Sequence, residues 1–393
     1  TSQLDPEGSD EVFRAVEALT NSGITILMIE QKIEKLAAYC DRILLLHGGK
    51  QIAFDTPQKV FSMPDLADYG IQAPAFTRIC KAEHVTLPDG TYPVTVEEAA
   101  GVLKERHAGG TEAKGAAKTD EKKNSEVLGE EQFLTKDLDF SYLPDVPVLK
   151  ALNMRLDKRP TAIIGQNGAG KTTLVKLLKG LLKPVSGNIY FQGEDISGKT
   201  VAMLAGNVGY VFQNPDDQIF KYNVMDEIMF GPLNIGMDPK RAEEETKRAL
   251  ELTGLTGKEK ENPYDLELYE RKMTAIASVL AMDTDVLILD EPTIAQDWKG
   301  RQIIGGIIRS LSERGKLVIA ILHDMDFVAE NFERVIIMAH GQVLADGTAR
   351  VFMKEEALKK ARLQKPYVMQ LSEVLGYERA YLTVDEILRD QVS

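Results

Sequence analysis

The sequence predicts an α/β fold with a parallel sheet as its core, helices on both sides and an added layer of antiparallel strands. Three observations predict it. A glycine-rich loop at residues 165–170 stands between an apolar run and a helix-like segment. Two further strand-like runs, 286–289 and 317–322, end in polar residues. Segments of the N-terminal part match segments of the C-terminal part at a fixed spacing.

Length and composition limit the number of domains and the class of protein. The 393 residues are 44% apolar and 27% charged, which is typical of globular proteins and long enough for two domains. No apolar run approaches the ~18 to 20 residues that span a bilayer, so work at a membrane requires another protein as anchor. A formal net charge of -13 disfavours a general nucleic-acid role. Cys40 and Cys80 form no CxxC pair, which disfavours a metal cluster and favours a reducing compartment.

The internal repeat is the main evidence on domain organisation. Four residue pairs are separated by the same 292 positions (297 − 5 for the first): Asp5 with Asp297, Gln31 with His323, Arg42 with Arg334, and Pro74 with Pro366. The second copy begins near Gln132, so the first copy would begin about 160 residues before Thr1. We therefore expect the chain to be the tail of a longer tandem protein. The alternative is a small stand-alone N-terminal domain.

This repeat predicts five segments. They are a C-terminal fragment of the first domain (1–68), its small helical appendix (69–107), a flexible linker (108–131), a complete second domain (132–352) and a second helical appendix (353–393). The linker is rich in Gly, Ala, Lys, Glu and Thr and has no apolar periodicity, which is typical of a flexible chain.

The glycine-rich loop matches the pattern GxxxxGK[ST] between a strand-like and a helix-like segment. The matching residues are Gly165, Gln166, Asn167, Gly168, Ala169, Gly170, Lys171 and Thr172. Glycines let backbone N–H groups close around phosphate oxygens, and the helix that follows directs its positive end there. Lys171 would reach the β- and γ-phosphates, and the Thr172 hydroxyl would coordinate Mg²⁺. The loop therefore predicts binding of a nucleoside triphosphate with Mg²⁺.

Polar residues at the ends of later strands predict the rest of the chemistry. Asp290 suits Mg²⁺ coordination, and Glu291 can polarise an attacking water as general base. The alternative for these two carboxylates is a helix N-cap. His323 follows a buried strand at the interval expected of a γ-phosphate sensor, although a lone histidine there is usually structural. Gln213 would complete the metal and water shell, and Tyr142 would stack on adenine unless it belongs to the core.

The order of these motifs resembles the nucleotide-binding domain of ATP-binding-cassette (ABC) proteins. The order is Tyr142, the glycine-rich loop, Gln213, Asp290–Glu291, Asp297 and His323. The resemblance covers about residues 131–352, and the tail of a first such domain covers about 1–68. It implies a P-loop ATPase fold with a helical subdomain, ATP and Mg²⁺ as cofactors, and further nucleotide contacts from Thr173 and Asp297. It also implies catalysis by Glu291, His323, Lys171 and Gln213.

Within that family, the stretch Phe212–Phe220 is similar to ATPases of energy-coupling-factor importers, which take up vitamins and transition-metal ions. This implies a transmembrane scaffold protein and a small substrate-binding membrane protein as partners, a peripheral place on the cytoplasmic face of the cell membrane, and no nucleic acid. The alternatives are an ABC exporter ATPase and a soluble ABC ATPase acting on ribosomes or DNA. The linker is too short and too rich in Gly and Ala for the ribosome class, and heptad coiled coils of the DNA class are not visible.

One family motif is degraded. In the family, two domains pair head to tail, and each ATP lies between the glycine-rich loop of one and the signature LSGGQ of the other. Residues 266–270 read Leu-Glu-Leu-Tyr-Glu at that position. A carboxylate from Glu267 about 4 Å from phosphate would repel it by roughly 4 kcal/mol at an effective dielectric near 20. Gln31 also replaces the histidine in the first copy, so we expect one hydrolytic and one mainly structural ATP site.

Overall fold

The computed structural model describes residues 6–109 and 129–392, and the chain divides into two compact units. The first unit holds the described part of 1–126 together with 325–330 and 364–393. The second unit holds the described part of 127–324 together with 331–363. The expected linker lies largely outside the described residues, although helix α5 (Val96–Gly109) continues into its first two positions.

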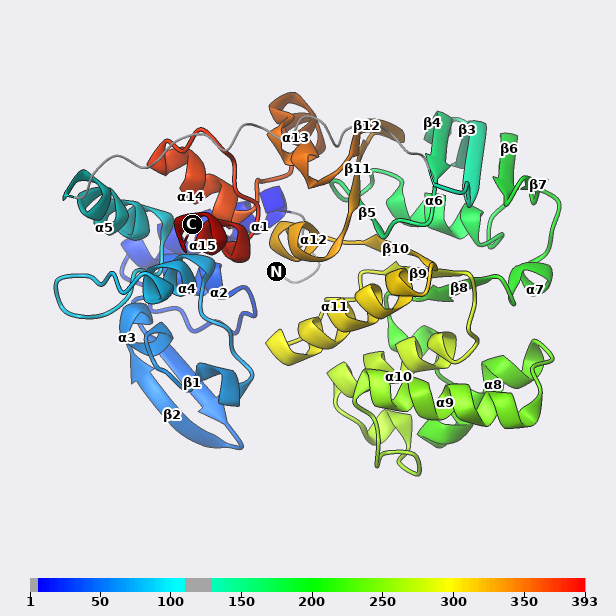
Figure 1. Ribbon diagram of the computed structural model, residues 1–393, viewed down its shortest axis with the longest axis horizontal. Helices are drawn as coiled ribbons and strands as arrows, with labels where there is room; N and C mark the ends of the chain where they lie inside the picture. Colours follow the sequence, from blue (N-terminus) through cyan, green and yellow to red (C-terminus); the bar gives the residue numbers. More distant parts are fainter. Residues whose placement is uncertain (1–5, 110–128, 393) are drawn as a thin grey trace. The chain divides into compact units, whose positions relative to one another are not determined.

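The described part of the second unit contains a six-stranded sheet (Figure 1). Its order is β12 (Gln342–Gly347), β11 (Arg334–Ala339), β5 (Thr161–Ile164), β10 (Leu317–Ile321), β9 (Val286–Asp290) and β8 (Val208–Val211). Neighbouring strands are parallel except for the antiparallel hairpin of β11 and β12. Strands β5, β8, β9, β10 and β11 are buried at every position, which explains their continuous apolar sequences. The parallel core predicted from the sequence is confirmed.

A second, antiparallel sheet provides the added layer. Its order is β4 (Val146–Leu156), β3 (Phe133–Leu143), β6 (Ser186–Phe191) and β7 (Glu194–Asp195). The two sheets and helix α6 (Lys171–Leu178) share one apolar core, which includes Leu138, Leu174 and Ile319. This packing fixes the start of α6 beside the end of β5. The predicted antiparallel layer is therefore present, and Tyr142 belongs to its strand β3.

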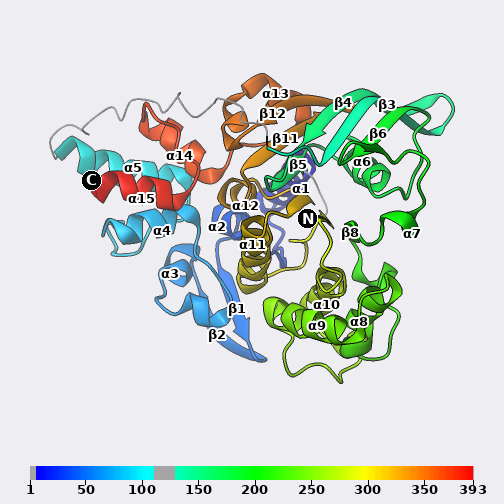
Figure 2. The same cartoon turned by 45° about the vertical axis from the view of Figure 1, so that its right-hand side comes forward.

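The remaining elements of the second unit are helical. Helices α8 (Val224–Asn234), α9 (Pro239–Thr253) and α10 (Leu268–Leu280) pack on one another and lie side by side in Figure 1 and Figure 2. They form the expected helical subdomain. The others are α7 (Val201–Leu204), η3 (Pro215–Asp217), η4 (Pro263–Asp265), α11 (Trp298–Glu313), η5 (Ala349–Met353) and α13 (Glu355–Ala361). Capping residues mark both ends of helix α9. Asp238 accepts hydrogen bonds from the N–H groups of Lys240 and Arg241 at the start, and Gly254 ends the helix in a left-handed conformation.

The first unit repeats part of the second at the spacing found in the sequence. Its hairpin pairs β1 (Ile43–His47) with β2 (Lys50–Asp55), and the register shifts between Leu45 and Leu46. Hairpin β11–β12 shifts its register between Ile337 and Met338, again 292 positions later (337 − 45). The shared irregularity is structural evidence for the repeat.

The two helical appendices lie in one unit and share one apolar core. Helices α4 (Ala75–Ala82) and α5 pack against α14 (Tyr367–Leu375) and α15 (Val384–Val392) through side chains that include Phe76, Leu103 and Leu371. The other helices of this unit are α1 (Pro6–Asn21), α2 (Ile33–Tyr39), α3 (Pro57–Phe61), η1 (Leu66–Tyr69) and α12 (Met325–Asn331), whose last residue belongs to the second unit. The sequence predicted the helices but not their common core.

One apolar run of the first unit forms no strand. Residues 25–29 stand 292 positions before β10, yet Leu27 and Ile29 are 91% and 100% exposed. Strand β10 is flanked by β5 and β9, whereas the described residues of the first unit contain no counterparts of those two strands. A strand needs ladder partners for its N–H and C=O groups, which explains the difference. Among the described residues, no helix is both long and apolar enough to span a bilayer.

Candidate active site

The glycine-rich loop joins the buried strand β5 to the N-terminus of α6. Gly165, Gly168 and Gly170 have φ values of 154°, 78° and 95°, a region that L side chains rarely adopt. A Cβ atom on Gly165 would overlap the carbonyl oxygen of Met338, and one on Gly170 would lie 2.8 Å from a Leu149 methyl. The backbone therefore needs glycine on steric grounds, and the loop presents N–H groups at the positive end of α6.

Lys171 lies inside this loop. Its ammonium donates hydrogen bonds to the carbonyl oxygens of Gly165 at 2.7 Å and Gln166 at 2.9 Å, and the residue is 6% exposed. A buried charge is costly unless it is paired or hydrogen-bonded, and these carbonyls hold the ammonium next to the N–H groups of the loop. The loop is therefore suited to an anion with several oxygens.

Asp290 ends strand β9 beside the start of α6. Its carboxylate accepts a hydrogen bond from the Tyr210 hydroxyl at 2.7 Å and one from the Thr172 hydroxyl at 3.4 Å. Burial raises the pKa of the Asp290 carboxyl, and the hydrogen bond from Tyr210 opposes that rise. The oxygens of Asp290, Thr172 and the side-chain amide of Gln213 are hard donors of the kind Mg²⁺ prefers. These residues fit the Mg²⁺ that the family implies.

Glu291, His323 and Gln213 meet through their side chains. One Glu291 carboxylate oxygen lies 3.0 Å from His323 Nε2, and the other accepts from the Gln213 amide at 2.7 Å. Burial raises the pKa of the Glu291 carboxyl, but the hydrogen bond and charge of His323, with Lys171 and Lys272 nearby, outweigh it and leave that pKa below its usual value. The carboxylate is thus held ionised, as a proton acceptor requires.

Two further predicted residues, Tyr142 on β3 and Thr173 at the start of α6, contact each other. The Tyr142 ring is 57% exposed, its edge packs on Phe140 with the centroids 4.9 Å apart, and its hydroxyl shares a 3.3 Å hydrogen bond with the Thr173 hydroxyl. An exposed ring does not fit the core alternative. Asp297, for which the family resemblance implies a nucleotide contact, is the N-cap of α11, and its carboxylate accepts the Gly300 N–H at 2.7 Å.

The degraded signature lies at the N-terminus of α10. Glu267 is the N-cap, and its N–H donates to the Glu270 carboxylate at 3.3 Å. Lys258 forms a 2.9 Å ion pair with the same carboxylate. The carboxylate of Glu270 thus already occupies the helix end that would otherwise attract phosphate.

Two residues of this site were missed by sequence reasoning. Tyr210 is buried in β8, and a buried tyrosine needs a partner for its hydroxyl, which is the signal that could have found it. Lys272, on α10, donates to the carbonyl oxygens of Glu291 at 2.6 Å and Gln213 at 3.0 Å. No spacing rule points to Lys272, because its partners are backbone atoms of distant segments.

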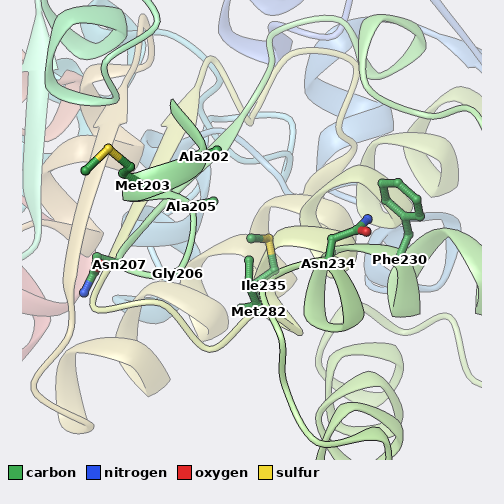
Figure 3. A pocket seen from close by; sticks show the side chains of 10 residues that line it. Ala202, Met203, Ala205, Gly206, Asn207, Phe230, Asn234, Ile235 and Met282 are labelled. Carbon is green, nitrogen blue, oxygen red and sulfur yellow. The ribbon is translucent and has the colours of Figure 1, made fainter. Parts of the chain in front are cut away.

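A separate cavity of about 500 Å³ lies away from these residues in the same unit (Figure 3). It is lined by segments 202–207 and 230–235 and by Met282. Figure 3 shows the side chains of Met203, Ile235 and Met282 around it. None of the predicted site residues lines it.

Comparison with known proteins identifies the family. The model of the ABC transporter family matches residues 149–294. A putative ABC transporter ATP-binding protein of Caldanaerobacter subterraneus subsp. tengcongensis is 34% identical over 406 residues, covering 99% of this chain and 68% of that protein. A second such relative, from Methanosarcina acetivorans, is 34% identical over 390 residues, covering 95% of this chain, which spans 62% of its length.

Two shorter relatives carry more specific names. The energy-coupling factor transporter ATP-binding protein of Methanocaldococcus jannaschii is 38% identical over 246 residues, covering 62% of this chain and 88% of that protein. The solved structure of cbiO1 from Clostridium perfringens, described as part of the ABC transporter complex cbiONQ, is 33% identical with a TM-score of 0.53 and covers 59% of this chain and 94% of that one. This chain therefore belongs to the ABC transporter ATP-binding proteins, a family of ATPases that bind ATP through the cassette described above.

Proposed function

We propose that this chain is the energy-coupling subunit of an importer of the energy-coupling-factor type, which takes up a vitamin or a transition-metal ion. The names of two relatives support this type, since one is an energy-coupling factor transporter ATP-binding protein and the other is part of a transporter complex. The stretch Phe212–Phe220 supports it as well. In this proposal the chain lies on the cytoplasmic face of the membrane, bound to a transmembrane scaffold protein.

The observation that carries the proposed chemistry is the Glu291 carboxylate held between His323 and Gln213. The backbone N–H groups of the loop and Lys171 bind the β- and γ-phosphates. Glu291 accepts a proton from the attacking water, and His323 orients the Glu291 carboxylate and faces the γ-phosphate. Thr172, Gln213 and Asp290 would hold Mg²⁺, which would supply charge stabilisation when bound.

We further propose that hydrolysis is confined to one of two ATP sites. In a head-to-tail pair, the N-terminus of α10 would face the nucleotide of the other domain. Two carboxylates, Glu267 and Glu270, stand there in place of a serine and a glutamine. Each would repel a phosphate, so this face is poorly suited to clamp a nucleotide for hydrolysis. The hydrolytic site uses Lys171, Glu291 and His323 of this chain.

The surface that we assign to the scaffold protein follows Gln213 along the chain. Phe220, Tyr222 and Phe230 are 53%, 85% and 38% exposed, and the Phe220 and Phe230 rings pack edge to face with centroids 4.6 Å apart. Phe230 also lines the cavity of Figure 3. Exposed apolar clusters of this kind are typical of interaction sites. These aromatic residues are close in sequence to Gln213. A membrane protein bound to them therefore has a short route to the site.

Affinity purification from detergent-solubilised native membranes tests the proposal. We expect one or two small, very hydrophobic proteins to co-purify with the tagged protein, and their bound ligand identifies the substrate. The substitution Tyr222→Glu should reduce their recovery without reducing ATP binding, whereas Lys171→Ala should do the reverse. Recovery of ribosomal proteins or DNA without a membrane protein would refute the importer assignment and leave the ATPase assignment standing.

A further inference from the structure

Lys272 is a buried cation on helix α10 of the second unit. The residue is 2% exposed, and its ammonium donates to the carbonyl oxygens of Glu291 and Gln213 at 2.6 and 3.0 Å. Burial lowers the pKa of Lys272 to about 8, although the charges of Glu291 and Asp290 oppose that shift. Burying an ammonium is costly unless it is hydrogen-bonded. The hydrogen bonds to the two carbonyl oxygens offset part of that cost and fix the two carbonyl groups relative to each other.

The backbone of Glu291 needs such support. Its φ is 51°, a left-handed conformation that is unfavourable for a residue with a long side chain. Strain of this kind costs about 1–3 kcal/mol and persists only where neighbouring groups fix the backbone. The Glu291 N–H donates to the carbonyl oxygen of Ile321 at 3.1 Å. The Glu291 carbonyl oxygen accepts from Lys272 at 2.6 Å and, over a longer 3.4 Å, from the Ile294 N–H. These bonds hold the peptide groups on either side of the Glu291 Cα, and so aim the carboxylate between His323 and Gln213.

Lys272 also connects this backbone to α10. Glu267, the N-cap of α10, stands five residues before it. In the head-to-tail pair proposed above, that N-cap faces the second nucleotide. A shift of α10 caused by that nucleotide would move the ammonium and, with it, the carbonyl groups of Glu291 and Gln213.

We propose that Lys272 is a positioning residue that holds Glu291 and Gln213 in their active geometry and transmits the state of the degenerate ATP site to the hydrolytic one. The inference rests on the proposed function, because it takes Glu291 as the proton acceptor. It adds a residue that touches no nucleotide and a physical link between the two sites.

The chain offers a matched control in Lys179. This lysine is also buried, at 7% exposure, and burial lowers its pKa to about 8 as well. It lies at the C-terminal end of α6, and its ammonium donates to the carbonyl oxygen of Val208 in β8. A general effect of removing a buried lysine should therefore appear in both Lys179→Met and Lys272→Met, whereas a positioning effect should appear only in the second.

Hydrogen–deuterium exchange on this chain tests the positioning directly, without any turnover. In Lys272→Met, we expect amides of segments 211–217 and 290–296 to exchange at least about 10-fold faster than in the parent chain, because a hydrogen bond to a charged group is lost at each. Lys272→Arg, which keeps a charged donor, should restore most of the protection, and Lys179→Met should leave both segments unchanged. Unchanged exchange in Lys272→Met, or an equal increase in Lys179→Met, would overturn the proposal.

Steady-state hydrolysis by the ATPase assembly that contains this chain gives an independent readout. We expect Lys272→Met to lower kcat at least about 10-fold with KM for ATP changed less than about threefold, since the loop that binds phosphate is intact. In a Glu291→Gln background, Lys272→Met should have no further effect. An equal effect in both backgrounds contradicts action through Glu291. If Glu291→Gln hydrolyses as fast as the parent, the proposed function fails, and the exchange result still decides the positioning.

Discussion

Replacing Tyr210 with phenylalanine removes one hydroxyl from the site and leaves the ring in place. The hydroxyl donates to Asp290 at 2.7 Å, and both residues are buried, at 6% and 2% exposure. Water cannot readily replace the lost donor. A hydrogen bond to a charged group contributes about 1.5–3 kcal/mol, so we expect Tyr210→Phe to lower the free energy of unfolding by that amount at neutral pH.

The pH dependence separates the hydrogen bond from packing. Burial raises the pKa of folded Asp290 above its unfolded value, so Asp290 contributes stability below its unfolded pKa that is lost as pH rises through the folded pKa. The Tyr210 hydrogen bond opposes this shift, and the variant therefore has a still higher folded pKa. The two proteins should differ most at neutral pH, where the carboxylate is charged, and should converge as pH falls toward the usual carboxyl range near 4.

Urea unfolding of both proteins at several pH values, followed by fluorescence and circular dichroism, measures the difference. Mg²⁺ affinity in the presence of ATP provides a second readout, because only the charged Asp290 can coordinate Mg²⁺. As pH falls, it should weaken at a higher pH in the variant than in the parent protein, because the folded pKa of Asp290 is higher in the variant. A destabilisation that is equal at pH 7 and in acid would indicate lost packing, and no destabilisation at pH 7 would refute the hydrogen-bond argument.

Three further predictions follow from the site and its surroundings. Gly165→Ala should abolish ATP binding measured by calorimetry, because its Cβ would overlap the Met338 carbonyl oxygen. Gly168→Ala has open space around the new Cβ, so it should lower the free energy of unfolding by only about 1–2 kcal/mol. Similar ATP binding by both variants would contradict the steric reasoning. Tyr142→Ala should weaken ATP binding about 5- to 10-fold while Tyr142→Phe retains it, as expected for stacking; equal losses would indicate a role for the hydroxyl. Burial lowers the pKa of Lys179 in the folded chain from 10.5 to about 8, so between these pH values the unfolded chain binds more protons than the folded chain. The free energy of unfolding should therefore rise with pH across that window, and Lys179→Met should flatten the rise. An unchanged slope in the variant would refute this.

Much of the site could be predicted because its parts follow strands of one parallel sheet. Asp290 ends β9, Lys171 and His323 come after β5 and β10, and the carboxyl ends of parallel strands meet at one edge. Gln213 follows β8 in the same way. Knowledge of where each strand ends was therefore enough to expect these residues together, although they are far apart in the sequence.

The parts that sequence reasoning missed depend on packing between distant segments. Lys272 contacts two backbone carbonyl oxygens 59 and 19 positions away. Every residue has a carbonyl oxygen, so the sequence does not indicate which ones a lysine will contact. The common core of the two helical appendices was missed for the same reason. Periodicity predicts an apolar face on α4 and on α14, but not which helix covers that face. The apolar run 25–29 shows the converse, since a strand-like sequence without ladder partners forms no strand.

The most direct test of the account compares two substitutions in the ATPase assembly that contains this chain. Glu291→Gln removes the proposed proton acceptor, and Glu267→Ala removes a carboxylate from the degraded signature without touching the hydrolytic site. The measurement is the steady-state rate of phosphate release at saturating Mg-ATP. We predict that Glu291→Gln lowers the rate at least about 100-fold, equivalent to about 3 kcal/mol in the barrier, and that Glu267→Ala leaves it within about threefold. Equal losses from the two substitutions, or full activity of Glu291→Gln, would contradict a single hydrolytic site built on Glu291.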